Sequence, residues 1–69
     1  MSVFSERLIE LRDGRNLSQK EVAAEFGVVV RAYQRYEYGE REPQLSTLLR
    51  MADFYGVSID YLAGRTDTP

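Results

Sequence analysis

A three-residue connection between two short helices is the feature that most constrains how this sequence folds. Ser18-Gln19-Lys20-Glu21 has the form of a capping box, in which the Ser18 hydroxyl accepts from the Glu21 amide, so a helix begins here. Gly27 ends that helix at a position suited to a positive φ, and the next helix is predicted to run from Val30 to Tyr38. A turn as short as Gly27-Val28-Val29 makes the second helix cross the first steeply.

The remaining residues predict three further helices and no strand. Apolar residues recur at helical spacing from Val3 to Asp13, from Leu45 to Tyr55 and from Ile59 to Ala63. Ser2 and Ser58 are the predicted N-caps of the first and last of these helices. A glycine suited to a helix end follows each segment: Gly14, Gly56 and Gly64. The inward stripe of the 45–55 helix is predicted to be Leu45, Leu48, Met51, Ala52 and Tyr55. The fold class is therefore all-α, with five helices.

Length and composition limit what such a domain can do. Sixty-nine residues suffice for one domain with one core, which we place at residues 1–65, with the two-helix unit at 18–38. The polar tail at 66–69 is expected to fray. The sequence has no Cys and no His, which removes disulfides, thiolate metal sites and the commonest general base. We therefore expect no catalysis, no metal, no cofactor and no small-molecule ligand.

The expected location follows from the apolar segments. The longest uninterrupted apolar run is Val28-Val29-Val30, far shorter than a membrane span. The first residues show no basic segment followed by an apolar one, so we expect no signal peptide. The expectation is a cytoplasmic protein with no membrane partner.

The short turn and its surroundings together indicate a function. A helix pair joined in this way is a helix-turn-helix, which can lay its second helix in the major groove of DNA, although such pairs occur in many all-α proteins. A wider and more specific pattern surrounds it: Leu11-Arg12, Leu17-Ser18-Gln19, Glu21-Val22-Ala23, Gly27-Val28, Tyr36-Glu37, Gly39, Pro43, Leu45, Ala52, and Tyr55 to Leu62. This pattern, from about Phe4 to Arg65, resembles the XRE-like family of lambdoid phage repressors and Cro proteins. The resemblance implies a five-helix domain that recognises a double-stranded DNA operator as a twofold dimer and regulates transcription.

Residues of the second helix are the predicted readers of DNA bases. Matched to the family, Val30, Arg31 and Arg35 fall at base-facing positions, and Gln34 also points outward. Arg pairs bidentately with guanine and Gln with adenine, whereas Val offers only a methyl surface to thymine. The alternative for Gln34 is a solvent-facing position beside the groove. This helix carries positive charges only between Val29 and Tyr36, so the net charge of −2 does not exclude DNA as the partner.

Four other residues are predicted to contact the DNA backbone. Gln19 matches the family residue at the start of a helix that touches a phosphate, where exposed amides also favour an anion. Asn16, Tyr38 and Arg41 lie at edges that would approach the flanking phosphates. The alternatives are solvated loop positions for Asn16 and Arg41, and for Tyr38 a ring packed on Pro43 or on the loop.

Other residues have expected structural roles. Arg12 and Glu37 match a family pair that forms a mostly buried salt bridge, and neither is expected to contact DNA. Tyr33 and Tyr36 have the spacing of core residues. Val29 stands where the family has a capping Ser or Thr, and Gln44 is a second weak cap, so these two helix starts lack a good side-chain acceptor.

The last helix is the expected site of dimerisation. In the family the surface around the last two helices makes the twofold contact, and Val57, Ile59, Tyr61 and Leu62 lie there. Val57 and Leu62 are expected in the core, which leaves Ile59 and Tyr61 for a small interface and a homodimer that is weak without DNA. The leading interpretation is a dimeric transcriptional repressor of phage or bacterial type. The alternative is a protein-interaction module of the same fold, such as an antitoxin, that binds a partner chain through the valine surface.

Overall fold

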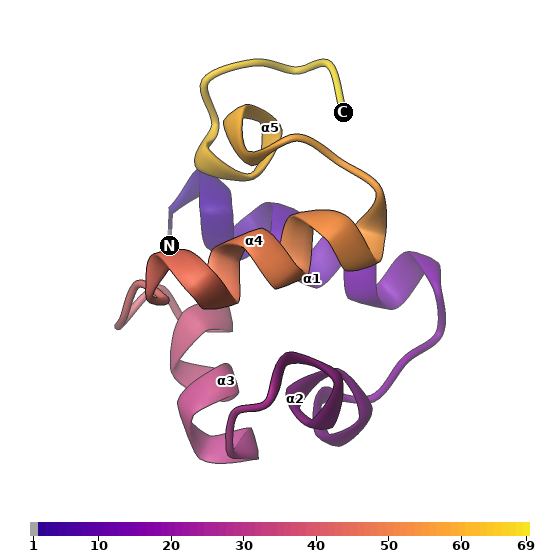
Figure 1. Cartoon of the computed structure of the whole chain (residues 1–69), viewed down its shortest axis with the longest axis vertical. Coiled ribbons are helices and arrows are strands. Elements are labelled where there is room, and N and C mark those ends of the chain that lie inside the picture. The colour runs from indigo at the N-terminus through magenta and orange to yellow at the C-terminus, as the bar shows by residue number, and fades with distance from the viewer. Residues whose placement is uncertain (1) are drawn as a thin grey trace.

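Five helices and their connections make up residues 2–69, the part of the chain that the computed structural model describes (Figure 1). They are α1 (Val3–Gly14), α2 (Gln19–Phe26), α3 (Val30–Glu37), α4 (Leu45–Tyr55) and α5 (Ile59–Ala63). Residues 2–69 contain no strand, which confirms the all-α prediction. Within the same residues no helix has the length and apolarity needed to cross a membrane.

The predicted helix starts are confirmed at the serines. The Ser18 hydroxyl accepts from the Glu21 amide at 3.0 Å while the Glu21 carboxylate accepts from the Ser18 amide at 2.9 Å, which completes the capping box. The Ser2 hydroxyl caps α1 by accepting from the Ser5 amide, and the Ser58 hydroxyl caps α5 by accepting from the Tyr61 amide. Each of these caps satisfies an amide that would otherwise lack a partner in the first helical turn.

The end of α1 differs from the prediction. The helix includes Gly14, and the left-handed backbone lies two residues later, at Asn16 with φ of 56°. Asn tolerates this conformation better than most residues because its short polar side chain bonds locally. The chain can therefore turn after α1 without using the glycine.

The turn between α2 and α3 has the predicted geometry. Gly27 adopts φ of 70°, and the amides of Gly27 and Val28 donate to the carbonyls of Ala24 and Ala23 at 3.2 and 3.0 Å. A Cβ at position 27 would meet only the movable guanidinium end of the exposed Arg50 side chain, so glycine is favoured here by the positive φ and not by lack of space. In Figure 1 α2 is seen nearly end-on while α3 runs in the plane of view, so the two axes cross steeply.

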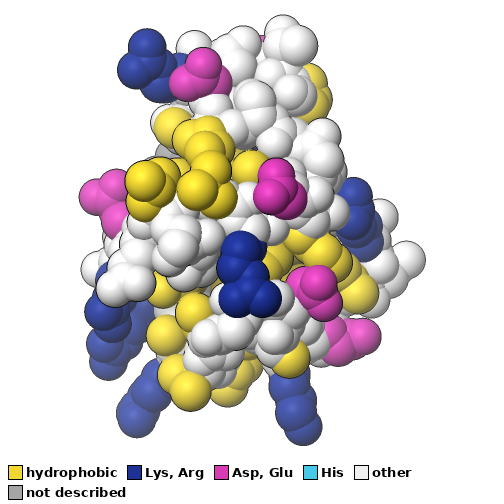
Figure 2. Space-filling model, viewed as in Figure 1, with side chains coloured by type: hydrophobic (Ala, Val, Ile, Leu, Met, Phe, Trp, Pro, Cys, Tyr) yellow, Lys and Arg dark blue, Asp and Glu magenta, His cyan; other side chains and the backbone are white. Residues whose placement is uncertain are grey.

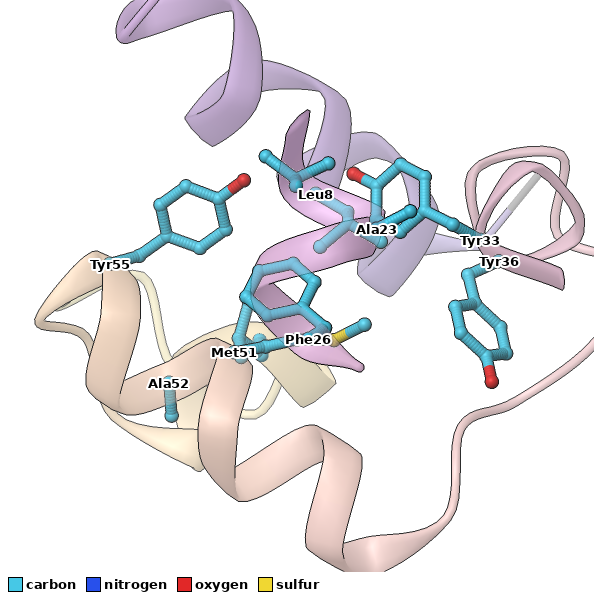
Figure 3. Packing of buried hydrophobic residues seen from close by; sticks show 10 residues of the cluster. Leu8, Ala23, Phe26, Tyr33, Tyr36, Met51, Ala52 and Tyr55 are labelled. Atoms are coloured by element: carbon cyan, nitrogen blue, oxygen red, sulfur yellow. The ribbon is translucent and has the colours of Figure 1, made fainter. Parts of the chain in front are cut away.

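The core is built around Phe26, the last residue of α2. Its ring centroid lies 5.5 Å from that of Phe54, 6.0 Å from that of Tyr55 and 6.1 Å from that of Tyr33. Figure 3 shows side chains from α1, α2, α3 and α4 packed into one cluster. The buried apolar residues are Leu8, Val22, Ala23, Phe26, Tyr33, Tyr36, Met51, Ala52, Tyr55 and Leu62. Tyr33 and Tyr36 are therefore core residues, as the spacing predicts.

One predicted core residue of α4 is exposed. Leu48, Met51, Ala52 and Tyr55 pack in or against the core, whereas Leu45 is 67% exposed. The prediction for Leu45 is wrong because α4 meets Phe26 of α2 through Phe54 and Tyr55 in its last turn, which leaves the first turn at the edge of the core.

Arg7 holds the residues that follow α5. Its guanidinium donates to the Thr66 carbonyl at 2.6 Å and to the Asp67 carboxylate at 2.8 Å, and also to the Tyr61 carbonyl. It lies 4.1 Å from the centroid of the Tyr61 ring, a cation–π contact. These contacts connect the segment after α5 to α1 at Thr66 and Asp67. The fraying of residues 66–69 stays a prediction.

The missing cap of α3 gives a stability prediction. Val29 is the N-cap residue, forms no side-chain cap and is 71% exposed, so replacing it removes little buried surface. We expect Val29→Ser to raise the free energy of unfolding by a few tenths to about 1 kcal/mol, because its hydroxyl can accept from an unpaired amide of the first turn. Thermal melts measure the change.

Val29→Ala is the matched control, since it shortens the side chain without supplying an acceptor. A Ser variant that melts below both the parent and the Ala variant would contradict the capping explanation.

Candidate nucleic-acid interface

The outer face of α3 brings together the four predicted base-reading residues. Positions 30, 31, 34 and 35 share one side of a helix, because residues four apart are neighbours on its surface. Val30 is 40% exposed, Arg31 and Arg35 are exposed, and Gln34 is half-buried. The opposite side of α3 buries Tyr33, Tyr36 and Glu37. One side of α3 is therefore fixed to the core, and the other side is exposed to solvent.

The arginines of this face are available for a partner. Across residues 2–69 the ion pairs use Arg7, Arg12 and Arg65, and none involves Arg31 or Arg35. Figure 2 shows Lys and Arg side chains projecting from the lower end of the molecule, where α2 and α3 lie in Figure 1. The outer face of α3, formed by Val30, Arg31, Gln34 and Arg35, thus carries two positive charges and no negative one, even though the net charge of the chain is −2.

The four predicted backbone-contacting residues come from the start of α2 and from the segments before α2 and after α3. Gln19 is the first residue of α2, while Asn16 is exposed just before it. Tyr38 follows α3 and is 57% exposed, so more than half of its surface is open to solvent. Arg41 is exposed in the α3–α4 loop, where it borders a hollow shared with Ser2 and Phe4 of the α1 start.

The buried carboxylate of Glu37 bonds the core-facing side of α3 to residues of α1 and α2. Glu37, 2% exposed, accepts from Arg12 Nε at 2.6 Å and Arg12 Nη2 at 3.1 Å, which is the ion pair that the resemblance implies. It also accepts from the Tyr33 hydroxyl at 2.5 Å and from Gln19 Nε2 at 3.0 Å. Arg12 further donates to the Leu17 carbonyl at 2.9 Å, which fixes the connection before α2.

The hydrogen-bond donors around Glu37 keep its carboxyl group ionised. Burial by itself raises the pKa of Glu37, but the hydrogen bonds from Arg12, Tyr33 and Gln19 outweigh it and hold the pKa below its usual value of 4.5. The hydrogen bond to Glu37 likewise raises the pKa of Arg12, and burial raises that of Tyr33. The pair is therefore ionised at neutral pH.

Sequence reasoning missed the polar contacts around this ion pair. Gln34 Nε2 donates to Gln19 Oε1 at 3.1 Å, so two residues predicted separately to touch DNA are bonded to each other. The four-residue spacing of Tyr33 and Glu37 on one helix was a usable signal for their contact. Nothing in the sequence alone places the start of α2 beside Glu37.

Arg15 makes a further contact that the sequence does not predict. Its guanidinium donates to the carbonyls of Phe54 and Tyr55 at 3.0 and 3.2 Å, at the end of α4. A cation there bonds carbonyls that lack helical partners and complements the helix dipole. Arg15 therefore serves the packing of α4 rather than the DNA-facing surface.

The fold and this surface define a helix-turn-helix domain, and comparison with known proteins agrees. The sequence model of the helix-turn-helix family matches residues 8–62, so the chain belongs to this family. The chain is 41% identical over 66 residues to the transcriptional repressor RstR of the cryptic phage CTXphi from Vibrio cholerae. That alignment covers 96% of this chain and 60% of RstR, so the chain spans about three-fifths of this relative.

Solved structures share the fold. A transcriptional regulator from Listeria innocua superposes with a TM-score of 0.85 at 33% identity, over 88% of this chain and 57% of that one. The P22 c2 repressor, solved in complex with a synthetic operator, superposes with a TM-score of 0.83 at 27% identity, over 90% of this chain and 94% of that one. The resemblance to the lambdoid repressors is thereby confirmed.

Lowering the pH should destabilise the folded domain, because it protonates Glu37. A carboxylate whose pKa is lowered on folding contributes stability that is present above its unfolded value and is lost as the pH falls through the folded value. We therefore expect the free energy of unfolding to fall as the pH drops below about 4.5. Glu37→Gln should cost roughly 3–5 kcal/mol at pH 7, because it leaves the guanidinium of Arg12 without its counter-charge.

Denaturant titrations from pH 7 to pH 3 measure both effects. Glu10→Gln, which changes an exposed carboxylate of α1, is the matched control and should stay within about 0.5 kcal/mol of the parent at pH 7. Equal stabilities for Glu37→Gln and Glu10→Gln at pH 7 would show that the ion pair is not needed.

Proposed function

We propose that this chain is a sequence-specific DNA-binding transcriptional regulator that works as a repressor with α3 in the major groove. The observation that carries the proposal is the exposed face of α3, where Arg31 and Arg35 flank Gln34 and form no ion pair with any residue from 2 to 69. Support comes from the P22 c2 repressor, whose structure was solved with operator DNA and which shares this fold. A protein of this function acts in the bacterial cytoplasm, where the chromosome lies.

Each predicted contact has a role in this proposal. Arg31 and Arg35 donate to guanine edges, Gln34 contacts adenine, and Val30 meets a thymine methyl group. Gln19, Asn16, Tyr38 and Arg41 contact phosphates and set the position of α3 without reading sequence. No comparison favours the alternative of an antitoxin-like interaction module.

The operator is expected to be a near-palindrome bound by two copies. A single α3 covers few base pairs, and the small number of free cations limits how many phosphates one copy neutralises. Ile59 and Tyr61 remain the predicted twofold contact, and both are half-buried in the single chain. Arg7 covers one face of the Tyr61 ring, which leaves the rest of the ring for a partner. Half-sites should lie about 34 Å apart, one helical turn of DNA.

Substitutions on α3 test the mode of recognition. Arg31→Ala and Arg35→Ala should each weaken binding to a selected operator by roughly 1–3 kcal/mol and relax the preference at one base pair, because each loses a bidentate contact. Site selection from random DNA followed by titration measures both quantities.

Arg41→Ala is the matched control for charge. It should weaken binding evenly across sequences and lower the salt dependence by about one ion, because a phosphate contact carries no sequence information. If both α3 variants bind the selected site as well as the parent, α3 does not enter the groove.

A substitution at Ile59 tests whether two copies of the chain assemble on one operator. Ile59→Asp should lower affinity for a full operator while leaving half-site binding unchanged, because a charge in a small apolar interface removes cooperativity. Leu45→Asp places the same charge on an exposed residue outside the predicted interface and should change neither. Sedimentation with half and full sites gives the stoichiometry, and one copy per full site at saturation would contradict a dimer. Thermal melts show whether the Ile59 variant is folded, since Ile59 also packs against the core.

A further inference from the structure

The guanidinium of Arg7 contacts α5 both at its backbone and at one of its rings. It donates to the carbonyl oxygen of Tyr61 and lies 4.1 Å from the centroid of the Tyr61 ring. The Arg7 side chain is only 13% exposed, so this cation is largely enclosed by its partners. Leu8, the next residue of α1, is fully buried in the core. Arg7 therefore connects the ring of Tyr61 to a helix that is anchored in the core.

The ring of Tyr61 is held differently from its neighbours on α5. Leu62 is fully buried and Ile59 packs against the core. Tyr61 is half-buried, yet it belongs neither to the core cluster nor to the residues packed against that cluster. None of the aromatic ring pairs found within residues 2–69 includes it. The cation–π contact with Arg7 is therefore the interaction that fixes this ring.

This contact matters because α5 is short. Five residues form few internal hydrogen bonds, so the helix has little stability of its own. Arg7 adds a hydrogen bond to a carbonyl near the end of α5. A tyrosine on a helix surface otherwise samples more than one rotamer. With the guanidinium stacked on one face, the ring keeps one orientation while the rest of it stays accessible.

We propose that Arg7 is a positioning residue for assembly, which fixes the Tyr61 ring in the orientation that a second copy of the chain contacts. This inference rests on the proposed function, since it takes Tyr61 as part of the twofold contact. Ordering a mobile side chain on association lowers the affinity, and a ring that is fixed beforehand avoids that loss. In a twofold interface the effect occurs twice, once for each copy.

The segment after α5 provides a rival explanation for any effect of Arg7. The guanidinium also donates to the Thr66 carbonyl at 2.6 Å and to the Asp67 carboxylate at 2.8 Å. The Asp67 side chain is fully exposed, so this ion pair contributes little stability. If the segment rather than the ring met the second copy, a change at Asp67 would reduce assembly as much as a change at Arg7.

The test measures cooperativity, defined as the full-operator binding constant divided by the square of the half-site binding constant. The operator is selected from random DNA with the parent, and each protein is titrated against the full site and one half-site. Arg7→Met keeps an unbranched apolar stem and removes the guanidinium, and it should lower the cooperativity about tenfold. The fraction folded and the loss of one positive charge towards DNA affect both constants, so they cancel in this ratio.

Tyr61→Ala shows whether Arg7 acts through the ring. It should lower the cooperativity at least as much as Arg7→Met, because it removes the contact itself. In the Tyr61→Ala background Arg7→Met should cause no further loss, since the two residues act through one contact. The bond from Arg7 to the carbonyl of residue 61 remains possible in Tyr61→Ala. A further loss in the double variant would therefore show that Arg7 acts through the backbone of α5, which would overturn the proposal.

Two variants are matched controls. Arg65→Met removes the same charge just after α5, where Arg65 pairs with Asp60 and is 78% exposed. Asp67→Asn weakens the bond to the segment after α5 and leaves the ring contact in place. Both should keep the cooperativity of the parent.

The remaining outcomes each decide against the positioning role. It is overturned if Arg7→Met keeps the cooperativity of the parent, or if either control loses as much as Arg7→Met. If Tyr61→Ala keeps the cooperativity, Tyr61 is not in the twofold contact, which also overturns it. A parent that binds full sites without cooperativity would overturn both this inference and the predicted dimer. In each case the Arg31 and Arg35 variants, measured on half-sites, still decide whether α3 reads DNA.

Discussion

The buried carboxylate of Glu37 is the interaction on which the rest of this domain depends. It accepts from Arg12 of α1, Gln19 of α2 and Tyr33 of its own helix, so three helices meet at one charge. Apolar burial supplies the driving force for packing but is not directional. The carboxylate is directional, because each missing donor leaves part of a buried charge uncompensated. It therefore selects one arrangement of α1, α2 and α3 among those that the apolar surfaces allow.

The same arrangement produces the exposed face that we assign to DNA. α3 is only eight residues long and has little stability as an isolated helix. Tyr33, Tyr36 and Glu37 hold it against α1 and α2, which leaves Arg31 and Arg35 on a rigid support. A recognition surface on a fixed helix loses little conformational entropy on binding, which favours discrimination between sequences. Stability and recognition thus use opposite sides of one short element.

The charge distribution reconciles an acidic chain with a nucleic-acid partner. Eleven acidic and nine basic residues give a net charge of −2, yet the arginines of α3 make no ion pair within residues 2–69. Arg7 and Arg12, by contrast, are used inside the fold, one against the segment after α5 and the other against Glu37. What matters for DNA is the charge of the surface that meets it, which on the outer face of α3 comes from two arginines and no acidic residue, while the total charge limits non-specific affinity.

The sequence by itself determined the five helices, the serine caps of α1, α2 and α5, and the buried side of α3, because these depend on contacts within about four residues along the chain. The resemblance to a known family also predicted the Arg12–Glu37 ion pair, which the structure confirms, and the DNA-facing positions, which stay predictions. Only the tertiary structure decided that Leu45 is exposed, that Arg7 covers Tyr61, and that Gln19 joins Glu37 to Gln34. These features depend on which elements meet in space, and a pattern of spacing along one helix carries no information about its neighbours.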